Sequence, residues 1–206
     1  MKNPLHYQLT EYDCGPTTLM NAVSFLFARE DIPPEVIRNI MLYSLDCYGS
    51  EGTPGKEGTS CTAMMFLSNW LDGFGHTKRL LISTRYLSGK RVSVEKDSEL
   101  CYALQCGGVA VVRLYFDEAH YVLLTGIQGN SLLMFDPYYV DKPFPQKDII
   151  VTLDHPFAYN RVVPFSYFNQ TTKETYALGA PDSREAVLIF NEKTRLTAEK
   201  TIEYYI

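Results

Sequence analysis

The first third of the chain carries apolar residues at the spacing of buried α-helices. In the segment 15–29 they include Leu19, Val23 and Phe27, with others between them, which predicts a helix buried on most of its surface. Pro16 suits the first turn of this helix, because the backbone N–H that proline lacks would have no partner there. We therefore expect the chain to open with a helix that begins beside Pro16.

A second helix and a glycine-rich loop are expected to follow. The pair Pro33-Pro34 marks the start of this helix, which should run to about Leu45. The segment 46–58 contains four glycines and a proline with almost no apolar residues. Such a composition is typical of a surface loop, and a loop of this kind often borders a groove.

Residues that favour helix ends bound a third helix. Thr59 or Ser60 offers a side-chain oxygen to its first turn, and the stretch from Gly73 to Gly75 allows a left-handed cap at its end. Its apolar residues include Cys61, Met64, Met65, Leu67, Trp70 and Leu71. The first third of the chain is thus expected to be helical.

Beyond the third helix the pattern changes to that of β-strands, with many β-branched, leucine and aromatic residues. A short helix at 97–105, closed by Gly107 and Gly108, is expected to interrupt the strands, and the pattern between Pro137 and Pro181 is weak. The predicted strands are 79–84, 109–116, 120–127, 131–135 and 186–190.

These elements predict an α+β fold in a single domain that spans residues 1–206. A helical lobe (about 4–76) is expected to pack on an antiparallel β-sheet lobe (about 77–195), followed by a short tail (196–206). A chain of 206 residues with 46% hydrophobic content can bury a core of this kind. The cleft between two such lobes is where we expect a site.

Charge and apolar length argue against two kinds of partner. The chain has 19 basic and 24 acidic residues without long runs of one sign, so we expect no nucleic-acid partner. No apolar stretch is long enough to span a bilayer, and residues 1–10 lack the apolar core of a secretory signal. These features favour a cytoplasmic protein with no membrane span.

The five cysteines show neither the dense spacing of a disulfide framework nor a close zinc-binding pair. We expect reduced thiols, no metal and no cofactor. Cys101 and Cys106 are interpreted as core residues, and no histidine is placed to complete a metal site with Cys47 and Cys61.

Cys14 is the candidate nucleophile, because it stands at the start of the first predicted helix. Unpaired backbone N–H groups and the positive end of the helix dipole stabilise a thiolate there, and the thiolate is the attacking species. Gln8 lies six positions upstream and could direct its side-chain N–H toward the same place as the Cys14 backbone N–H. Two such donors would form an oxyanion hole, worth about 3 kcal/mol for each donor. Each residue taken alone has a simpler interpretation: a core cysteine and a solvated amide.

His120 is the candidate base among the four histidines, because it opens a predicted strand after the polar pair Asp117-Glu118. His6, His76 and His155 are interpreted as structural or solvated, although His6 is close enough to Gln8 to border the same cleft. A partly exposed histidine at a strand edge is the alternative for His120 itself.

Asp136, which ends the next predicted strand, is the candidate acid that orients His120. With a two-residue turn at Gly129-Asn130, Asp136 would point to the face opposite His120. An odd-length turn or a bulge would place both side chains on one face as diagonal neighbours. The mechanism therefore requires one of these irregularities. Otherwise Asp136 is a common turn residue before a proline.

These residues, in this order, resemble a known family. The segments are Gln8, Asp13-Cys14-Gly15, His120-Tyr121-Val122-Leu123 and Asp136-Pro137, and they resemble the bacteriocin-processing cysteine peptidases of the papain clan, which cleave after a double-glycine leader. The resemblance implies a papain-like fold with Cys14 as nucleophile, His120 as base and later acid, Asp136 as orienting residue and Gln8 as oxyanion donor. It implies no cofactor. Because no transporter or ATPase segment is recognisable, we expect a stand-alone enzyme.

The sequence is compatible with three functions. The first is hydrolysis of a peptide or related amide through a thioester on Cys14. The second keeps the thioester and passes the acyl group to an amine or thiol. The third is a peptide-binding module that keeps the fold without turnover.

Overall fold

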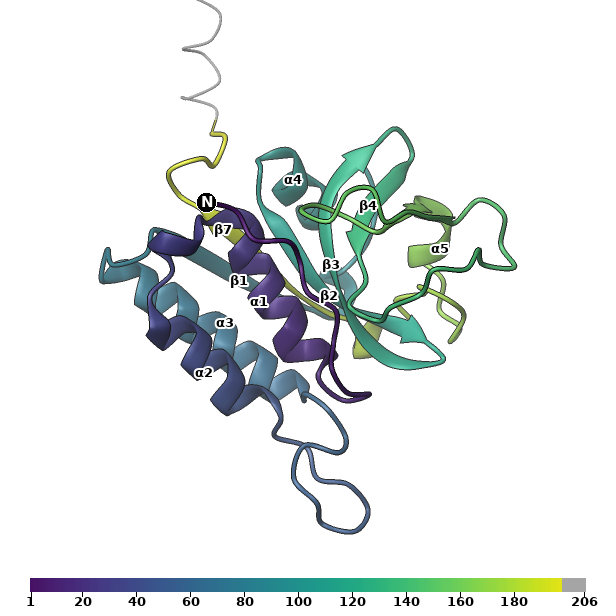
Figure 1. Ribbon diagram of the computed structural model, residues 1–206. Coiled ribbons are helices and arrows are strands. Elements are labelled where there is room, and N and C mark those ends of the chain that lie inside the picture. The colour runs from purple at the N-terminus through teal and green to yellow at the C-terminus, as the bar shows by residue number, and fades with distance from the viewer. Residues whose placement is uncertain (198–206) are drawn as a thin grey trace, which may run out of the picture.

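An open antiparallel sheet of seven strands organises residues 1–197, the part of the chain that this computed structural model describes. The strands lie in the order β1-β7-β2-β3-β4-β6-β5, so the last strand is inserted between the first two (Figure 1). The described fold is mixed α+β, as the sequence predicts. Most of the expected tail, from residue 198 onward, lies outside the described residues.

Five strands of this sheet correspond to predicted ones, and their lengths follow from their partners. The first was predicted at 79–84, which was wrong by several residues, because seven pairs with β7, from Ile82–Asn191 to Ser88–Glu185, set its limits. Pairing with a strand so distant in sequence cannot be seen in a local pattern. The strands are β1 Ile82–Ser88, β2 Val109–Phe116, β3 Glu118–Gln128, β4 Ser131–Phe135, β5 Ile150–Val151, β6 Arg161–Pro164 and β7 Glu185–Asn191.

The helices lie close to their predicted positions. The third begins after Ser60, whose hydroxyl accepts a hydrogen bond from the Ala63 backbone N–H at 3.0 Å, so Ser60 rather than Thr59 is the cap. The helices are α1 Cys14–Leu26, α2 Pro34–Ser44, α3 Cys61–His76, α4 Glu99–Gln105 and the single turn α5 Phe165–Phe168. Short 3-10 turns cover Arg29–Asp31, Gly89–Arg91 and Pro181–Ser183.

Two apolar cores lie on opposite faces of this one sheet. Leu19 of α1 and Leu67 of α3 belong to the core that includes Val111 and Leu123 on one face. Leu100 of α4 belongs to the core on the other face. Helices α1 to α3 thus form a layer against the sheet (Figure 1), and this layer is the predicted helical lobe. No helix in the described part of the chain is both long and apolar enough to cross a membrane.

The end of α3 differs from the prediction of a left-handed glycine cap at Gly73 to Gly75. The helix continues to His76, and the residue with positive φ is Lys78, at 60°. Gly75 has a different role, because a Cβ there would overlap the backbone carbonyl oxygen of Ile82. The absence of a side chain lets α3 approach the start of β1.

This contact distinguishes two glycines of the same helix. Gly75→Ala should lower the free energy of unfolding by about 2 to 4 kcal/mol, because the overlap forces α3 away from β1. Gly73→Ala should instead raise it by about 0.5 to 1 kcal/mol, since nothing lies within 4 Å of the added methyl group and alanine favours a helix. Urea unfolding of both variants checks the pair, and equal effects would contradict this account of Gly75.

Candidate active site

Cys14 is the first residue of α1, and its backbone N–H faces away from the helix it begins. The preceding Asp13 does not cap the helix with its side chain. Its carboxylate instead accepts hydrogen bonds from the backbone N–H groups of Leu9, at 3.0 Å, and Thr10, at 2.7 Å. Among the described residues, Thr17 is the first of α1 whose backbone N–H reaches a backbone acceptor, Asp13 O at 3.1 Å. The first amides of α1 therefore remain available beside the sulfur.

The glycine-rich loop reaches the same end of α1. A Cβ at Gly15 would overlap the side chain of Thr59, so Gly15 allows the loop to pack directly behind the nucleophile. Thr59 Oγ1 is buried there and has no hydrogen-bond partner among the described groups. The expectation of a loop at the edge of a groove agrees with this placement, because Gly58 and Thr59 both line the cleft beside Cys14.

A bulge in β3 brings His120 and Asp136 together. The turn between β3 and β4 has two residues, since Gln128 pairs with Ser131, but the register shifts between Leu124 and Gly126. The extra residue returns Asp136 to the face of His120, and His120 Nε2 lies 2.8 Å from Asp136 Oδ1. The prediction of an odd-length turn or a bulge is confirmed in its second form.

Asp136 is fully buried, and four groups saturate its polar atoms. Besides His120, its carboxylate accepts hydrogen bonds from the Tyr138 backbone N–H at 2.9 Å and from the Tyr176 hydroxyl at 3.0 Å. The Asn160 side chain bonds the Asp136 backbone twice, at 2.8 Å each: its Oδ1 accepts from the N–H and its Nδ2 donates to the carbonyl. Neither the backbone nor the side chain of Asp136 is left free to rotate.

The electrostatics of this pair favour an ion pair at neutral pH. Burial acts to lower the pKa of His120, but the charge and hydrogen bond of Asp136, and then Cys14, raise that pKa to about 10. Burial acts to raise the pKa of Asp136, but His120, the Tyr138 N–H and the charge of Arg161 hold it below its usual value. His120 is therefore an imidazolium held between a carboxylate and a sulfur.

The second nitrogen of His120 is left for Cys14. Because Nε2 bonds Asp136, Nδ1 is the nitrogen left for Cys14, which lines the same cleft and helps to raise the pKa of His120. An imidazolium in this place stabilises a thiolate by charge and by hydrogen bonding. The arrangement matches the predicted order of sulfur, imidazole and carboxylate.

Gln8 lines the same cleft as Cys14. Its backbone N–H donates to Pro137 O at 2.9 Å, so the strand exit that carries Asp136 also fixes the segment before α1. Its side-chain Nε2 donates to Thr10 O at 2.8 Å, which leaves one of its two N–H bonds without a partner here. Its Oε1 is buried and has no hydrogen-bond partner among the described groups.

The cleft has a volume of about 710 Å³ and a mixed polar and aromatic lining. Exposed carboxylates such as Glu11 and Glu118 lie on its rim. Arg113 lies deeper, and its Nε is 3.9 Å from the buried carboxylate of Glu185. The residues that line the cleft are Gln8, Glu11, Tyr12, Cys14, Lys56, Glu57, Gly58, Thr59, Arg113, Phe116, Asp117, Glu118, Ala119, His120, Tyr121 and Tyr138.

Three buried residues near Asp136 were not predicted from the sequence: Asn160, Arg161 and Tyr176. All lie in the weakly patterned region 137–181, where no periodicity indicates which polar side chains are buried. The one available signal is an arginine that directly precedes valine in a short strand-like run. This pattern is too common to single out Arg161.

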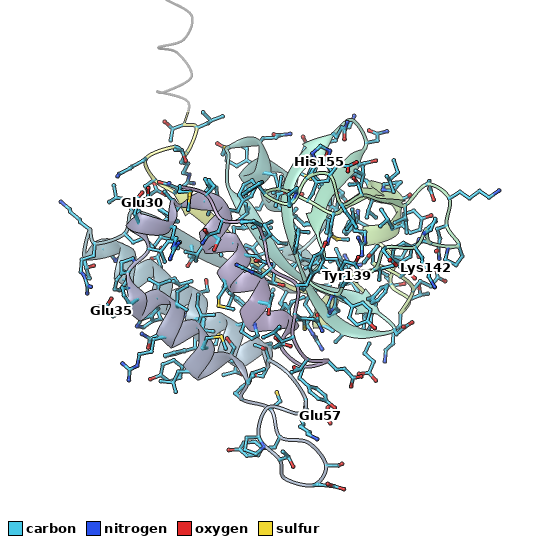
Figure 2. All side chains as sticks on the ribbon, in the orientation of Figure 1. Glu30, Glu35, Glu57, Tyr139, Lys142 and His155 are labelled. Carbon is cyan, nitrogen blue, oxygen red and sulfur yellow. The ribbon has the colours of Figure 1, made fainter. Side chains whose placement is uncertain are left out.

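The other histidines and cysteines lie elsewhere. His6, His76 and His155 are exposed and do not line the cleft. Figure 2 shows His155 at the opposite end of the molecule from Glu57, which does line it. Cys101 and Cys106 are buried in the core, as predicted, and all five cysteines are free. Within residues 1–197, no group of three or more His, Cys, Asp and Glu side chains is arranged to hold a metal ion.

The His120–Asp136 pair should make stability depend on pH. Because the folded-state pKa of His120, about 10, exceeds the unfolded value of 6.5, its contribution is full below pH 6.5 and is lost as the pH rises through 10. The stability difference between the native protein and His120→Gln should shrink by a few kcal/mol across this range. Urea unfolding at several pH values measures it.

The exposed His155 provides the control for this experiment. His155→Gln should leave the same difference constant over that pH range. A His120→Gln difference that stays equally constant would contradict the ion pair.

No protein-family model matches the chain, and no curated protein sequence matches it. The functional assignment therefore depends on the geometry of the cleft.

Proposed function

We propose that this protein is a cysteine peptidase or amide hydrolase that acts on a peptide substrate through a thioester on Cys14, within a papain-like fold. One observation carries the proposal: a single buried imidazole is bonded to Asp136 and lines the same cleft as Cys14, which helps to raise the pKa of that imidazole. The sulfur, the imidazole and the Gln8 amide all line one cleft. A structural histidine would not need a nucleophile at the start of a helix as its second partner.

In the first half of the reaction, the Cys14 thiolate attacks the carbonyl carbon of the scissile amide. The π electrons of the carbonyl move to its oxygen, and the free N–H of Gln8 and the Cys14 backbone N–H stabilise the resulting oxyanion. When the intermediate collapses, the C–N bond breaks and the leaving nitrogen takes the proton of His120 Nδ1. The products are a free amine and a thioester on Cys14.

In the second half, neutral His120 accepts a proton from water as the water oxygen attacks the thioester. The C–S bond then breaks, the thiolate is restored beside the imidazolium, and the carboxylic acid leaves. Asp136 keeps the ring oriented in both halves, because its Oδ1 holds Nε2 while Nδ1 exchanges the proton. No metal or cofactor has a role in this scheme.

The cleft suits part of a peptide rather than a small amide. Its volume of about 710 Å³ is within the range of sites that hold drug-sized ligands, which corresponds to a few residues of an extended chain. Polar groups on both walls, from the loop at Gly58 to the strand end at Glu118, offer partners for a peptide backbone. A peptide substrate in the cytoplasm is consistent with the free thiols.

The activated sulfur can be tested without a substrate. Near pH 7, iodoacetamide should alkylate Cys14 at least about tenfold faster than the exposed Cys61, because the neighbouring imidazolium stabilises the attacking thiolate. Cys47 should react more slowly still, since burial and the nearby Asp46 raise its pKa. Peptide mass spectrometry of timed samples separates the sites.

Replacement of the imidazole isolates its contribution. His120→Ala should remove most of the advantage of Cys14, whereas the matched exposed variant His155→Ala should preserve it. Equal labelling of Cys14 and Cys61, or no effect of His120→Ala, would refute the proposal.

Turnover separates the three functional hypotheses. With a mixture of labelled peptides, the native protein should release new carboxyl and amino termini, and Cys14→Ser should lower the rate by at least about 1,000-fold. A labelled amine added to the reaction should compete weakly with water. Conjugate as the main product would favour acyl transfer, and tight binding without product would favour a peptide-binding module.

A further inference from the structure

Arg161 is a cation buried beside the candidate active site. It begins β6, is 0% exposed, and belongs to none of the ion pairs among the described residues. Its Nη1 donates to Asn160 O at 2.8 Å and its Nη2 to Tyr138 O at 3.4 Å, while its Nε has no partner in the described part of the chain. A charged group rarely remains in a protein interior without an electrostatic reason.

The carbonyls that Arg161 bonds belong to the two segments that hold Asp136. Tyr138 donates its backbone N–H to Asp136 Oδ1, and Asn160 bonds the Asp136 backbone in both directions. Arg161 thus connects the exit of β4 to the entry of β6 at the carboxylate. Its charge also acts directly on that carboxylate, since it helps to lower the pKa of Asp136.

Tyr176 completes this arrangement at a cost in backbone energy. Its hydroxyl donates to Asp136 Oδ2 at 3.0 Å, although its backbone adopts a φ of 63°. A bulky residue in the left-handed region costs about 1 to 2 kcal/mol, and glycine or asparagine would be cheaper there. The backbone is fixed by a hydrogen bond from Tyr176 N to Tyr115 O at 2.7 Å. This strained backbone conformation places the Tyr176 hydroxyl on the second oxygen of the Asp136 carboxylate.

We propose that Arg161 is a positioning residue of the Cys14 site, where its buried charge keeps Asp136 ionised and directed at His120, with Tyr176 as its partner. This inference rests on the proposed function, because it assigns Arg161 a role in maintaining the imidazolium at the sulfur. The groups then alternate in charge across the protein: sulfur, imidazolium, carboxylate, guanidinium. The titratable and charged groups that face the pair are Cys14 from α1, Arg161 from β6 and Tyr176.

The chain offers a matched control in a second buried arginine. Arg184 is 7% exposed and donates to the carbonyl oxygens of Gly179, Val92 and Asn169, at 2.8, 3.2 and 3.0 Å. It belongs to none of the described ion pairs, and the pKa of its guanidinium is lowered by burial alone. Arg184 therefore resembles Arg161 in burial and carbonyl bonding but lacks the carboxylate.

The test compares the pH dependence of Cys14 alkylation in Arg161→Gln, Arg161→Lys and Arg184→Gln. Without the guanidinium, the Asp136 carboxylate takes up a proton more readily, and once protonated it no longer stabilises the imidazolium of His120. The acid limb of the profile should therefore move upward by about one pH unit in Arg161→Gln. Arg161→Lys keeps the positive charge, so the acid limb of this variant should lie close to that of the native protein. Arg184→Gln should lower stability without moving the limb.

A proton NMR titration of the His120 ring in the same variants gives a readout that needs no substrate. The His120 signals should show the same upward shift of their acid transition, at which Asp136 takes up a proton, in Arg161→Gln. If the shift appears but no peptide is cleaved, the proposed function fails and the role of Arg161 stands. If cleavage persists with an acid limb that Arg161→Gln moves no further than Arg184→Gln does, the role of Arg161 is refuted.

A variant that keeps the arginine covers the case in which Arg161→Gln does not fold. Tyr176→Phe removes only the hydroxyl bond to Asp136 Oδ2, so the limb should move in the same direction by a smaller amount, about half a pH unit. An unchanged limb in Tyr176→Phe, together with an Arg161→Gln protein that cannot fold, would also overturn the proposal, because neither partner of Asp136 would then affect the pair.

Discussion

The hydrogen bond between His120 and the fully buried Asp136 is the constraint on which the rest of the site depends. A carboxylate without solvent costs several kcal/mol unless nearby groups compensate it. Here the compensation comes from parts of the chain that are far apart in sequence, including Tyr176 and Arg161. The buried acid therefore requires a nearly complete fold around it, and the sulfur at the start of α1 gains an oriented imidazolium as a result.

Sheet topology explains how these distant parts meet. Strand β6 follows β4 in space, so Asn160 and Arg161 lie at the end of β4 where Asp136 begins its turn. The Gln8 backbone bonds Pro137, which attaches the segment before α1 to the same strand exit. The catalytic candidates come from both the helix layer and the sheet. Hydrogen bonds close to Asp136, such as the one from the Gln8 backbone to Pro137, hold the two sets of residues at a fixed distance.

Local patterns in the sequence were sufficient for most elements, and of the four site candidates that they select, Gln8, Cys14 and His120 line one cleft and Asp136 bonds His120. Helix α1 and strands β2 and β4 could be predicted because their apolar periods are regular over the whole element. The bulge could be expected only on the assumption that His120 and Asp136 meet. Side chains alternate between the faces of a strand, and in a regular hairpin with a two-residue turn these two would point to opposite faces. Nothing local marks the bulge between Leu124 and Gly126, since its position depends on how β4 packs in the sheet. Arg161 and Tyr176 were missed for the same reason, because their partner is 25 or more residues away in sequence.

The separation of roles between the two layers has a physical consequence. Helix α1 supplies the sulfur and the backbone donors. The close packing of Gly15 on the Thr59 side chain holds the start of this helix in place. The sheet supplies the imidazole and the charges that set its protonation. Hydrogen bonds fail within a fraction of an ångström, whereas Coulomb interactions fall slowly with distance. A small shift between the layers would therefore separate the Cys14 sulfur from the His120 ring and leave the His120–Asp136 pair intact. The contacts that hold α1 on β3, such as the Thr18 hydroxyl bond to Tyr121 O at 3.0 Å, are therefore as necessary to the site as its titratable groups.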